Sequence, residues 1–333
     1  MKRIFEFLKL EISMIFPFFV GILLVKFPDA VKFISGTDFN LEEIVKNGWN
    51  LWTGWIFIII SIIWSIINFF RTRKICIIKV DGFTGDKYPE RIFGILGQQK
   101  YNSYNIKKVE NENEAVEAYN MINYGFKYYS GGDNCDIYCF QGVIDTPLLF
   151  FLGTLYGEQK KYIFYRKKHS NKKSFKRLCW CVKKVEPLVK DFIDNKSNEL
   201  VVRFHTSFKP DETIDSDFAN KDILTMMTTD LSKDIVIDSR DVITNKNKLY
   251  QWAEQCVKYI RNLCSKKDYK CVHLLLATST EMTFYLGTQL CQNYDKKIIV
   301  YSYDNKKEPK YWWGICPCEK DITKAIIYKE KNN

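Results

Sequence analysis

Two turns in this chain carry hydroxyl and amide groups where a buried strand passes into a helix. The first holds Gln141 and Gly142 and leads to Thr146, and the second is Thr278-Ser279-Thr280. A turn of this kind places polar groups at the positive N-terminus of the helix, where backbone N–H groups bind anions. We therefore expect both turns to line one site, held between two lobes, for a ligand with repeated negative charges.

The turns belong to a segment that the sequence contains twice. Residues 140–156 align with residues 274–290, so that Leu152-Gly153-Thr154 falls on Leu286-Gly287-Thr288. Each copy reads as an apolar strand, a polar turn, a helix that ends in small residues and a second strand rich in β-branched and aromatic residues. This order is typical of a βαβ unit with a parallel sheet.

The fold class is therefore α/β, with two pseudo-symmetric Rossmann-type lobes that we place at 75–195 and 196–333. Asp145 and Thr146 supply a helix cap, and Pro147 suits the first helical turn. Apolar patterning sets the other elements. Strands are expected at 74–80, 136–140, 161–165, 200–204, 234–237, 272–277, 297–302 and 325–328, and helices at 89–96, 112–124, 247–264 and 281–293.

Positive charge is concentrated in one segment. The net charge is +11, and Gln159 to Val185 contain eleven basic residues and no acidic one, so the rest of the chain is about neutral. Arg166 ends an expected strand and Lys168 follows it, which makes them candidates to neutralise ligand phosphates. A solvated basic loop and a contact with lipid headgroups are the alternatives.

Two apolar stretches precede the lobes. Residues 50–70 contain no charged side chain, and as a helix they would span roughly 30 Å, the thickness of the hydrocarbon core. The stretch at 5–26 is less uniform, and a cleaved signal peptide is the alternative there. Basic residues flank the far ends, so the positive-inside rule places both termini in the cytoplasm. We expect a transmembrane hairpin within 1–74.

Catalytic and metal signatures are absent from the sequence. It has no HExxH, no Gly-x-Ser-x-Gly and no paired-cysteine zinc motif, and Cys316-Pro-Cys318 is spaced too tightly for one. We expect no catalytic residue, no metal and no cofactor. If the chain were an enzyme, Asp81, Asp145 and Glu281 would be the available carboxylates.

The second copy resembles the C-terminal half of a SAVED domain. The resemblance lies in His273 to Thr288, in Ile298-Ile-Val-Tyr-Ser-Tyr303 and in Tyr311, and it departs at Thr278-Ser279, where such domains often have proline. It implies two fused CARF-like lobes that sense cyclic oligonucleotides made by cGAS-like nucleotidyltransferases in the bacterial anti-phage systems called CBASS. It also adds Tyr303 to the expected ligand-binding residues.

Together these features predict a membrane effector. The cytosolic sensor would bind a cyclic oligonucleotide, assemble with further copies and cluster the transmembrane helices at 5–26 and 50–70, which would disrupt the bacterial inner membrane. Its partners would be the ligand, membrane lipids and other copies of the chain, and no DNA or RNA duplex. A membrane-anchored nucleotide-processing enzyme and a lipid-binding structural protein are the alternatives.

Overall fold

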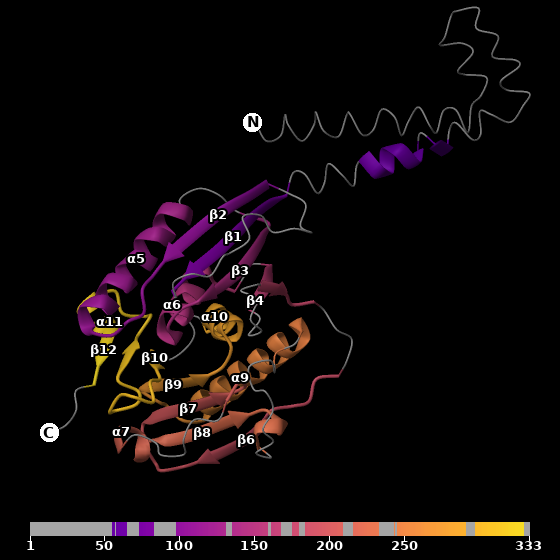
Figure 1. Cartoon of the computed structure of the whole chain (residues 1–333). Coiled ribbons are helices and arrows are strands. Elements are labelled where there is room, and N and C mark those ends of the chain that lie inside the picture. The colour runs from indigo at the N-terminus through magenta and orange to yellow at the C-terminus, as the bar shows by residue number, and fades with distance from the viewer. Residues whose placement is uncertain are drawn as a thin grey trace, which may run out of the picture. The chain divides into compact units, whose positions relative to one another are not determined.

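The structure is a computed structural model of the whole chain (Figure 1). The chain divides into two compact units, residues 1–73 with 94–98 and residues 74–93 with 99–333. The second unit holds both sheets described below. The structure describes residues 55–56, 58–64, 73–82, 98–130, 135–158, 161–167, 175–179, 184–208, 216–232, 243, 245–290 and 297–329.

The predicted transmembrane hairpin lies almost wholly outside the residues that the structure describes. The stretch at 5–26 lies outside the described residues, and of 50–70 only 55–56 and 58–64 are described, all as helix. Within the described parts of the chain, no helix is long and apolar enough to cross a membrane. The hairpin therefore stays a sequence prediction.

The first sheet contains five strands in the order β2-β1-β3-β4-β5. Strand β1 pairs in parallel with β3 and β3 in parallel with β4, whereas β5 adds an antiparallel edge. The almost unbroken apolar run of β1 suits a central parallel strand that is covered on both faces. The strands are β1 (Lys74–Asp81), β2 (Gln98–Asn105), β3 (Ile137–Val143), β4 (Tyr162–Lys167) and β5 (Phe175–Arg177).

The second sheet contains seven strands in the order β12-β11-β10-β9-β7-β8-β6. Its four central strands, β10, β9, β7 and β8, are parallel, and antiparallel strands close both edges. Both sheets are therefore mixed, with parallel centres. The strands are β6 (Val189–Ile193), β7 (Glu199–His205), β8 (Asp222–Met227), β9 (Cys271–Ala277), β10 (Lys297–Ser302), β11 (Trp313–Ile315) and β12 (Ile326–Tyr328).

Two helices, α6 and α10, lie between the sheets (Figure 1). Helix α10 contacts β3 and β4 of the first sheet, and α6 contacts β10 and β11 of the second, so each helix packs on the other lobe's sheet. Phe284 of α10 stacks on Phe140 of β3 with ring centroids 4.2 Å apart. The helices are α5 (Glu112–Ser130), α6 (Thr146–Tyr156), α7 (Ser216–Ala219), α8 (Thr229–Ser232), α9 (Lys246–Lys266), α10 (Thr280–Gln289) and α11 (Ile322–Ala325).

The repeated Leu-Gly-Thr forms the crossing point of α6 and α10. A Cβ on Gly153 would lie 2.2 Å from the carbonyl oxygen of Phe284, and a Cβ on Gly287 would lie 2.2 Å from that of Phe150. Real Cβ atoms do not approach backbone this closely, so only glycine allows the crossing. The two contacts are reciprocal, which is the pattern of a two-fold axis. The repeat thus builds the interface between the lobes.

Most elements of the repeat lie where the sequence predicts them. Strands β3 and β9 are each seven residues long, and in both copies the helix begins three residues after the strand. The predicted helix at 89–96 and strand at 234–237 lie outside the described residues. Strands β2, β5, β6, β8 and β11 were not predicted, and β6 joins the second sheet although it precedes residue 196.

Candidate functional site

The start of α10 is built from hydroxyl groups, as the sequence predicts. Ser279 is the N-cap residue, and its carbonyl oxygen accepts the first helical hydrogen bond, from Thr283 N at 3.0 Å. The hydroxyls of Thr278 and Thr283 lie 2.8 Å apart. Two of the hydroxyls at this turn therefore already have each other as partners.

A carboxyl group occupies the place at the start of α10 where an anion would bind. Glu281 is 1 % exposed, and its Oε2 has no hydrogen-bond partner among the described residues. Burial raises the pKa of Glu281, while the nearby Ser279 hydroxyl, the backbone N–H of Glu281 itself and the charge of Arg166 act in the opposite direction. Burial therefore favours the protonated form of this carboxyl, and the polar groups around it oppose that effect only in part.

Arg166, from the other lobe, interacts electrostatically with this carboxyl. It lies near the end of β4, on the same face of the strand as Tyr162 and Phe164, the face that α10 covers. Its Nη1 donates a hydrogen bond to the carbonyl oxygen of Ile243 at 2.9 Å. Burial lowers the pKa of the guanidinium, and the neighbouring Glu281 partly offsets this. The end of a first-sheet strand therefore meets the start of a second-lobe helix.

The start of α6 has the corresponding arrangement with the lobes exchanged. Asp145 precedes the helix, and its Oδ2 accepts a hydrogen bond from Val109 N at 3.0 Å. Burial raises the pKa of Asp145, the charge of Lys108 lowers it, and Asp304, just beyond β10, raises it again. Lys108 Nζ lies 4.0 Å from Asp304 Oδ2. Here the end of a second-sheet strand meets the start of a first-lobe helix.

Two half-sites result, and each combines one cation with acids, of which Glu281 is fully buried and Asp145 and Asp304 are partly buried. Arg166 and Glu281 form the first, and Lys108, Asp145 and Asp304 form the second. A carboxyl with a raised pKa can donate a hydrogen bond when protonated and accept one when ionised.

The profile of the SAVED family, described as the SMODS-associated and fused to various effectors sensor domain, matches residues 128–316. This is more than half of the chain. The chain belongs to the SAVED family. The two mixed sheets are consistent with the two CARF-like lobes of SAVED.

Solved SAVED/CARF-domain structures are similar to this chain at low sequence identity. A Cap4 receptor of Acinetobacter baumannii, solved with the cyclic trinucleotide 3'3'3'-cAAA, is 10% identical over 76% of this chain and 54% of its own, with a TM-score of 0.49. The same receptor with 2'3'3'-cAAA gives 12% identity, 76% and 54% coverage and a TM-score of 0.46. The Cap4 receptor of Moraxella osloensis is 11% identical over 75% of this chain and 51% of its own, with a TM-score of 0.39. The chain spans about half the length of these structures, and no curated protein matches it.

The predicted ligand residues of this SAVED chain are only partly brought together. Thr278, Ser279 and Thr280 lie at the start of α10 beside Arg166, and Thr146 lies at the start of α6. Tyr303 lies just beyond β10, where its ring is 6.1 Å from Phe208 and 5.3 Å from Tyr311, measured between centroids. Lys168 lies outside the described residues.

Gln141 lies on the other face of the first sheet. Phe140 faces α10, and successive strand residues point to opposite faces, so Gln141 points away from the lobe interface. It is fully buried, and neither side-chain atom has a partner among the residues that the structure describes. Gly142 follows, where a Cβ would lie 2.6 Å from Val80 Cβ, so close strand packing accounts for the glycine.

Sequence reasoning missed several groups at this edge of the SAVED fold. Lys108 and Asp304 are absent from the predicted site, because their loops follow strands whose ends meet only in the folded chain. Thr206, after β7, is also fully buried, and its hydroxyl has no partner within the described part of the chain. Its only sequence signal is its place after the strand at 200–204.

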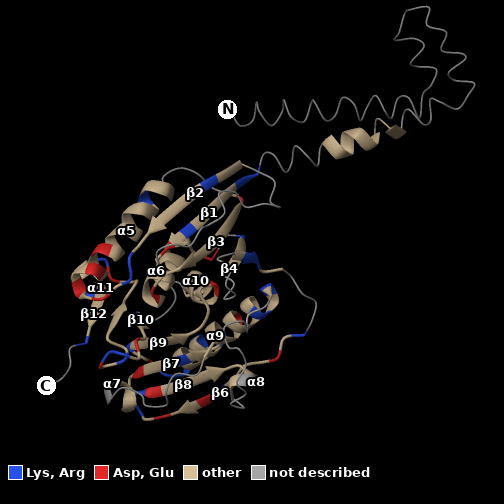
Figure 2. Ribbon diagram, viewed as in Figure 1, with Lys and Arg blue, Asp and Glu red and all other residues tan. Residues whose placement is uncertain are grey.

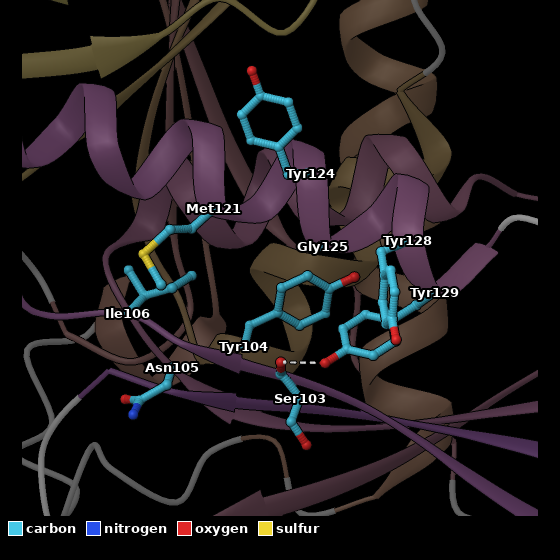
Figure 3. A pocket seen from close by; sticks show the side chains of 9 residues that line it. All are labelled: Ser103, Tyr104, Asn105, Ile106, Met121, Tyr124, Gly125, Tyr128 and Tyr129. Atoms are coloured by element: carbon cyan, nitrogen blue, oxygen red, sulfur yellow. Dashed lines mark hydrogen bonds between the residues drawn. The ribbon is translucent and has the colours of Figure 1, made fainter.

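A separate hollow of about 250 Å³ lies between β2 and α5, away from both half-sites. Figure 3 shows the rings of Tyr104, Tyr128 and Tyr129 gathered there, with the Tyr129 hydroxyl donating to the carbonyl oxygen of Ser103 at 3.2 Å. The residues that line it include no acidic or basic side chain and none of the predicted ligand-binding residues. The hollow therefore lacks the charges that an anionic ligand needs.

Proposed function

We propose that the chain is a sensor of cyclic oligonucleotides in a bacterial anti-phage (CBASS) system. The observation that carries the proposal is the SAVED match over 128–316, which contains the starts of α6 and α10 and the strands β3, β4, β9 and β10. The ligand would lie across the two half-sites, with its phosphates toward Arg166 and Lys108. The cyclic trinucleotides of the receptor structures are the first ligands to test.

Arg166 is the residue we expect to bind a phosphate. Of the basic segment at 159–185, Lys161, Lys176, Arg177 and Lys184 are exposed, whereas Arg166 is about half buried beside the start of α10. Figure 2 shows Lys and Arg in blue at the end of β4. A charge-assisted hydrogen bond contributes about 1.5–3 kcal/mol. An Arg166→Gln variant should therefore bind roughly tenfold to a hundredfold more weakly, while Arg177→Gln, in the same segment, should bind as the wild type does.

The test uses the full-length chain in detergent micelles with a panel of cyclic di-, tri- and tetranucleotides and their linear counterparts. A ligand that binds only the folded state raises the melting temperature, and its affinity follows from titration. One cyclic compound should raise the melting temperature where its linear form does not. Equal loss of affinity in both arginine variants would indicate general charge attraction. An unchanged melting temperature with every compound would contradict the sensor proposal.

The output of the sensor is a separate part of the proposal. Residues 5–26 and 50–70 would cross the inner membrane as a hairpin with both termini cytoplasmic, and binding would cluster these hairpins and disrupt the membrane. Its support is the uncharged stretch at 50–70. No catalytic step is part of the proposal.

Cells that express the chain with its cognate nucleotidyltransferase should lose membrane potential, measured with a voltage-sensitive dye. The same cells expressing residues 75–333 should keep it. A reporter fused after Asn333 should be active only in its cytoplasmic form. Toxicity of the truncated chain would point instead to an enzymatic activity of the lobes, and a periplasmic reporter signal would contradict the topology.

A further inference from the structure

A tight turn at the end of β11 brings two cysteines together. The backbone N–H of Glu319 donates to the carbonyl oxygen of Cys316 at 3.2 Å, which closes a β-turn with Pro317 at its second position. Cys316 N donates to the carbonyl oxygen of Ala325 at 2.7 Å, so the start of the turn is anchored to the neighbouring chain segment. Cys316 and Cys318 therefore have a fixed separation.

The two sulfur atoms lie 3.1 Å apart, and both cysteines are free thiols. A disulfide bond is about 2.05 Å long, so closing it requires a movement of only about 1 Å. Cys316 is fully buried, whereas Cys318 is partly exposed at the surface of the turn. One thiol of the pair is thus accessible to a small molecule, and the other is accessible only to its neighbour.

A metal ion fits this cluster less well. With Zn–S bonds of about 2.3 Å, two thiolates of a tetrahedral site stand roughly 3.8 Å apart, which is wider than the pair here. Glu319 is the third potential ligand, and its Oε1 accepts from Lys297 Nζ at 3.0 Å. The carboxylate is therefore already held by a cation.

We propose that Cys316 and Cys318 are a redox modification site that low-molecular-weight disulfides oxidise to an intrachain disulfide. The Cys318 thiolate attacks one sulfur of the external disulfide, breaks its S–S bond and releases one small thiol. The resulting mixed disulfide is attacked by the Cys316 sulfur, which gives up its proton, and the second small thiol leaves. Two protein thiols are oxidised and one external disulfide is reduced to two thiols.

The surroundings set the order of these steps. Burial raises the pKa of Cys316 to about 12, with Cys318 adding to the rise, and the charge of Lys297 partly offsets it. Cys316 is therefore a poor first nucleophile. It gains reactivity only toward a sulfur that is already in contact with it. Cys318 starts the reaction, and Cys316 completes it.

The test uses the full-length chain in detergent, incubated with oxidised glutathione, denatured, and labelled with N-ethylmaleimide. A single tryptic peptide, residues 311–320, contains both cysteines, so mass spectrometry reads the pair directly. We expect it to lose two hydrogens and both labels, and to regain both labels after dithiothreitol. The peptide 249–258 carries Cys256 alone, which is buried, and should stay fully labelled.

Two variants separate the roles of the thiols. Cys316→Ser should leave Cys318 as a stable mixed disulfide with glutathione, and Cys318→Ser should leave Cys316 labelled and unmodified. A wild-type peptide that keeps two labels overturns the proposal. Equimolar zinc in the purified chain that both variants lose also overturns it, since the pair would then be a metal site. Equal glutathione adducts in both variants would contradict the assigned order.

Discussion

At the scale of single residues, each half-site contains a carboxyl group whose pKa is raised by burial. Glu281 and Asp145 each lie at a helix start, where a negative charge is favoured, yet burial raises the pKa of both. The helix and the nearby cation favour the ionised form, whereas loss of water favours the protonated form. The net result is that the pKa of both carboxyls lies above its usual value.

This balance predicts a stability effect of Glu281→Gln that depends on pH. Because the pKa of Glu281 is raised from its usual 4.5, the folded state keeps a proton that the unfolded state has lost, so the carboxyl costs stability as pH rises. The cost is absent below the unfolded-state pKa, grows between the two pKa values and is constant above them. The variant should be more stable than the wild type at neutral pH. The difference should be about 1.4 kcal/mol for each pH unit by which the pKa of Glu281 in the folded state exceeds that in the unfolded state.

Thermal unfolding across this pH range measures the effect. Glu117→Gln, at an exposed position on α5, is the matched control for the loss of a carboxyl group. If Glu281→Gln were instead less stable at neutral pH, the ionised carboxylate and its attraction to Arg166 would outweigh the cost of burial.

At the scale of elements, the repeat can be recognised in the sequence, but its role in the packing of α6 against α10 cannot. Gly153 and Gly287 stand out in the alignment as shared small residues, and the structure shows that they permit the close crossing of α6 and α10. Small residues at a helix end have several possible causes, and only the packing partner distinguishes them. The partner lies in the other copy, far away in sequence.

Three of the strands that sequence reasoning missed, β2, β5 and β6, lie at sheet edges, whereas β8 and β11 lie inside the second sheet and are mostly buried. Strand β2 is almost entirely polar, β6 is exposed along its whole length, and β5 and β11 have three residues each. Edge strands bury little, so they carry little apolar pattern. Central strands such as β1 and β9 are buried on both faces and were predicted close to their true bounds. Two residues of the candidate site, Lys108 and Asp304, were missed because they lie in loops, which carry no apolar pattern.

The crossing predicts that either Gly→Ala change destabilises the chain. At Gly153 and Gly287 the added methyl group would meet backbone atoms, which cannot rotate away, so the helices must separate. Overpacking of this kind costs about 1–3 kcal/mol. Urea unfolding of the purified chain measures it.

Thr154→Ala is the control for this experiment. Thr154 follows Gly153, and its hydroxyl donates only to the carbonyl oxygen of Phe151 within the same helix. We expect a much smaller loss than for Gly153→Ala. Similar losses for both changes would mean that the helix crossing tolerates a larger residue.

At the scale of the whole molecule, the two lobes share a core. Phe284 of the second lobe contacts rings of the first, including Phe140, Tyr162 and Phe164. Both sheets also belong to one compact unit. Neither lobe can therefore bury its inner face without the other.

This shared core predicts that the lobes unfold together. Phe284→Ala should lower the stability of both sheets equally, by about 3–5 kcal/mol, because a fully buried ring is removed. Hydrogen exchange followed by mass spectrometry of the full-length chain would show faster exchange in β3 and in β9 alike. Faster exchange in β9 alone would indicate that the lobes are independent folding units.

The reciprocal glycine contacts have one more consequence. A sensor made of two identical subunits must offer the same groups twice, whereas a fused pair can change each half on its own. Here the two half-sites differ, because the first has an arginine with a glutamate and the second has a lysine with two aspartates. A cyclic ligand bound across the two proposed half-sites would therefore meet different groups on its two sides.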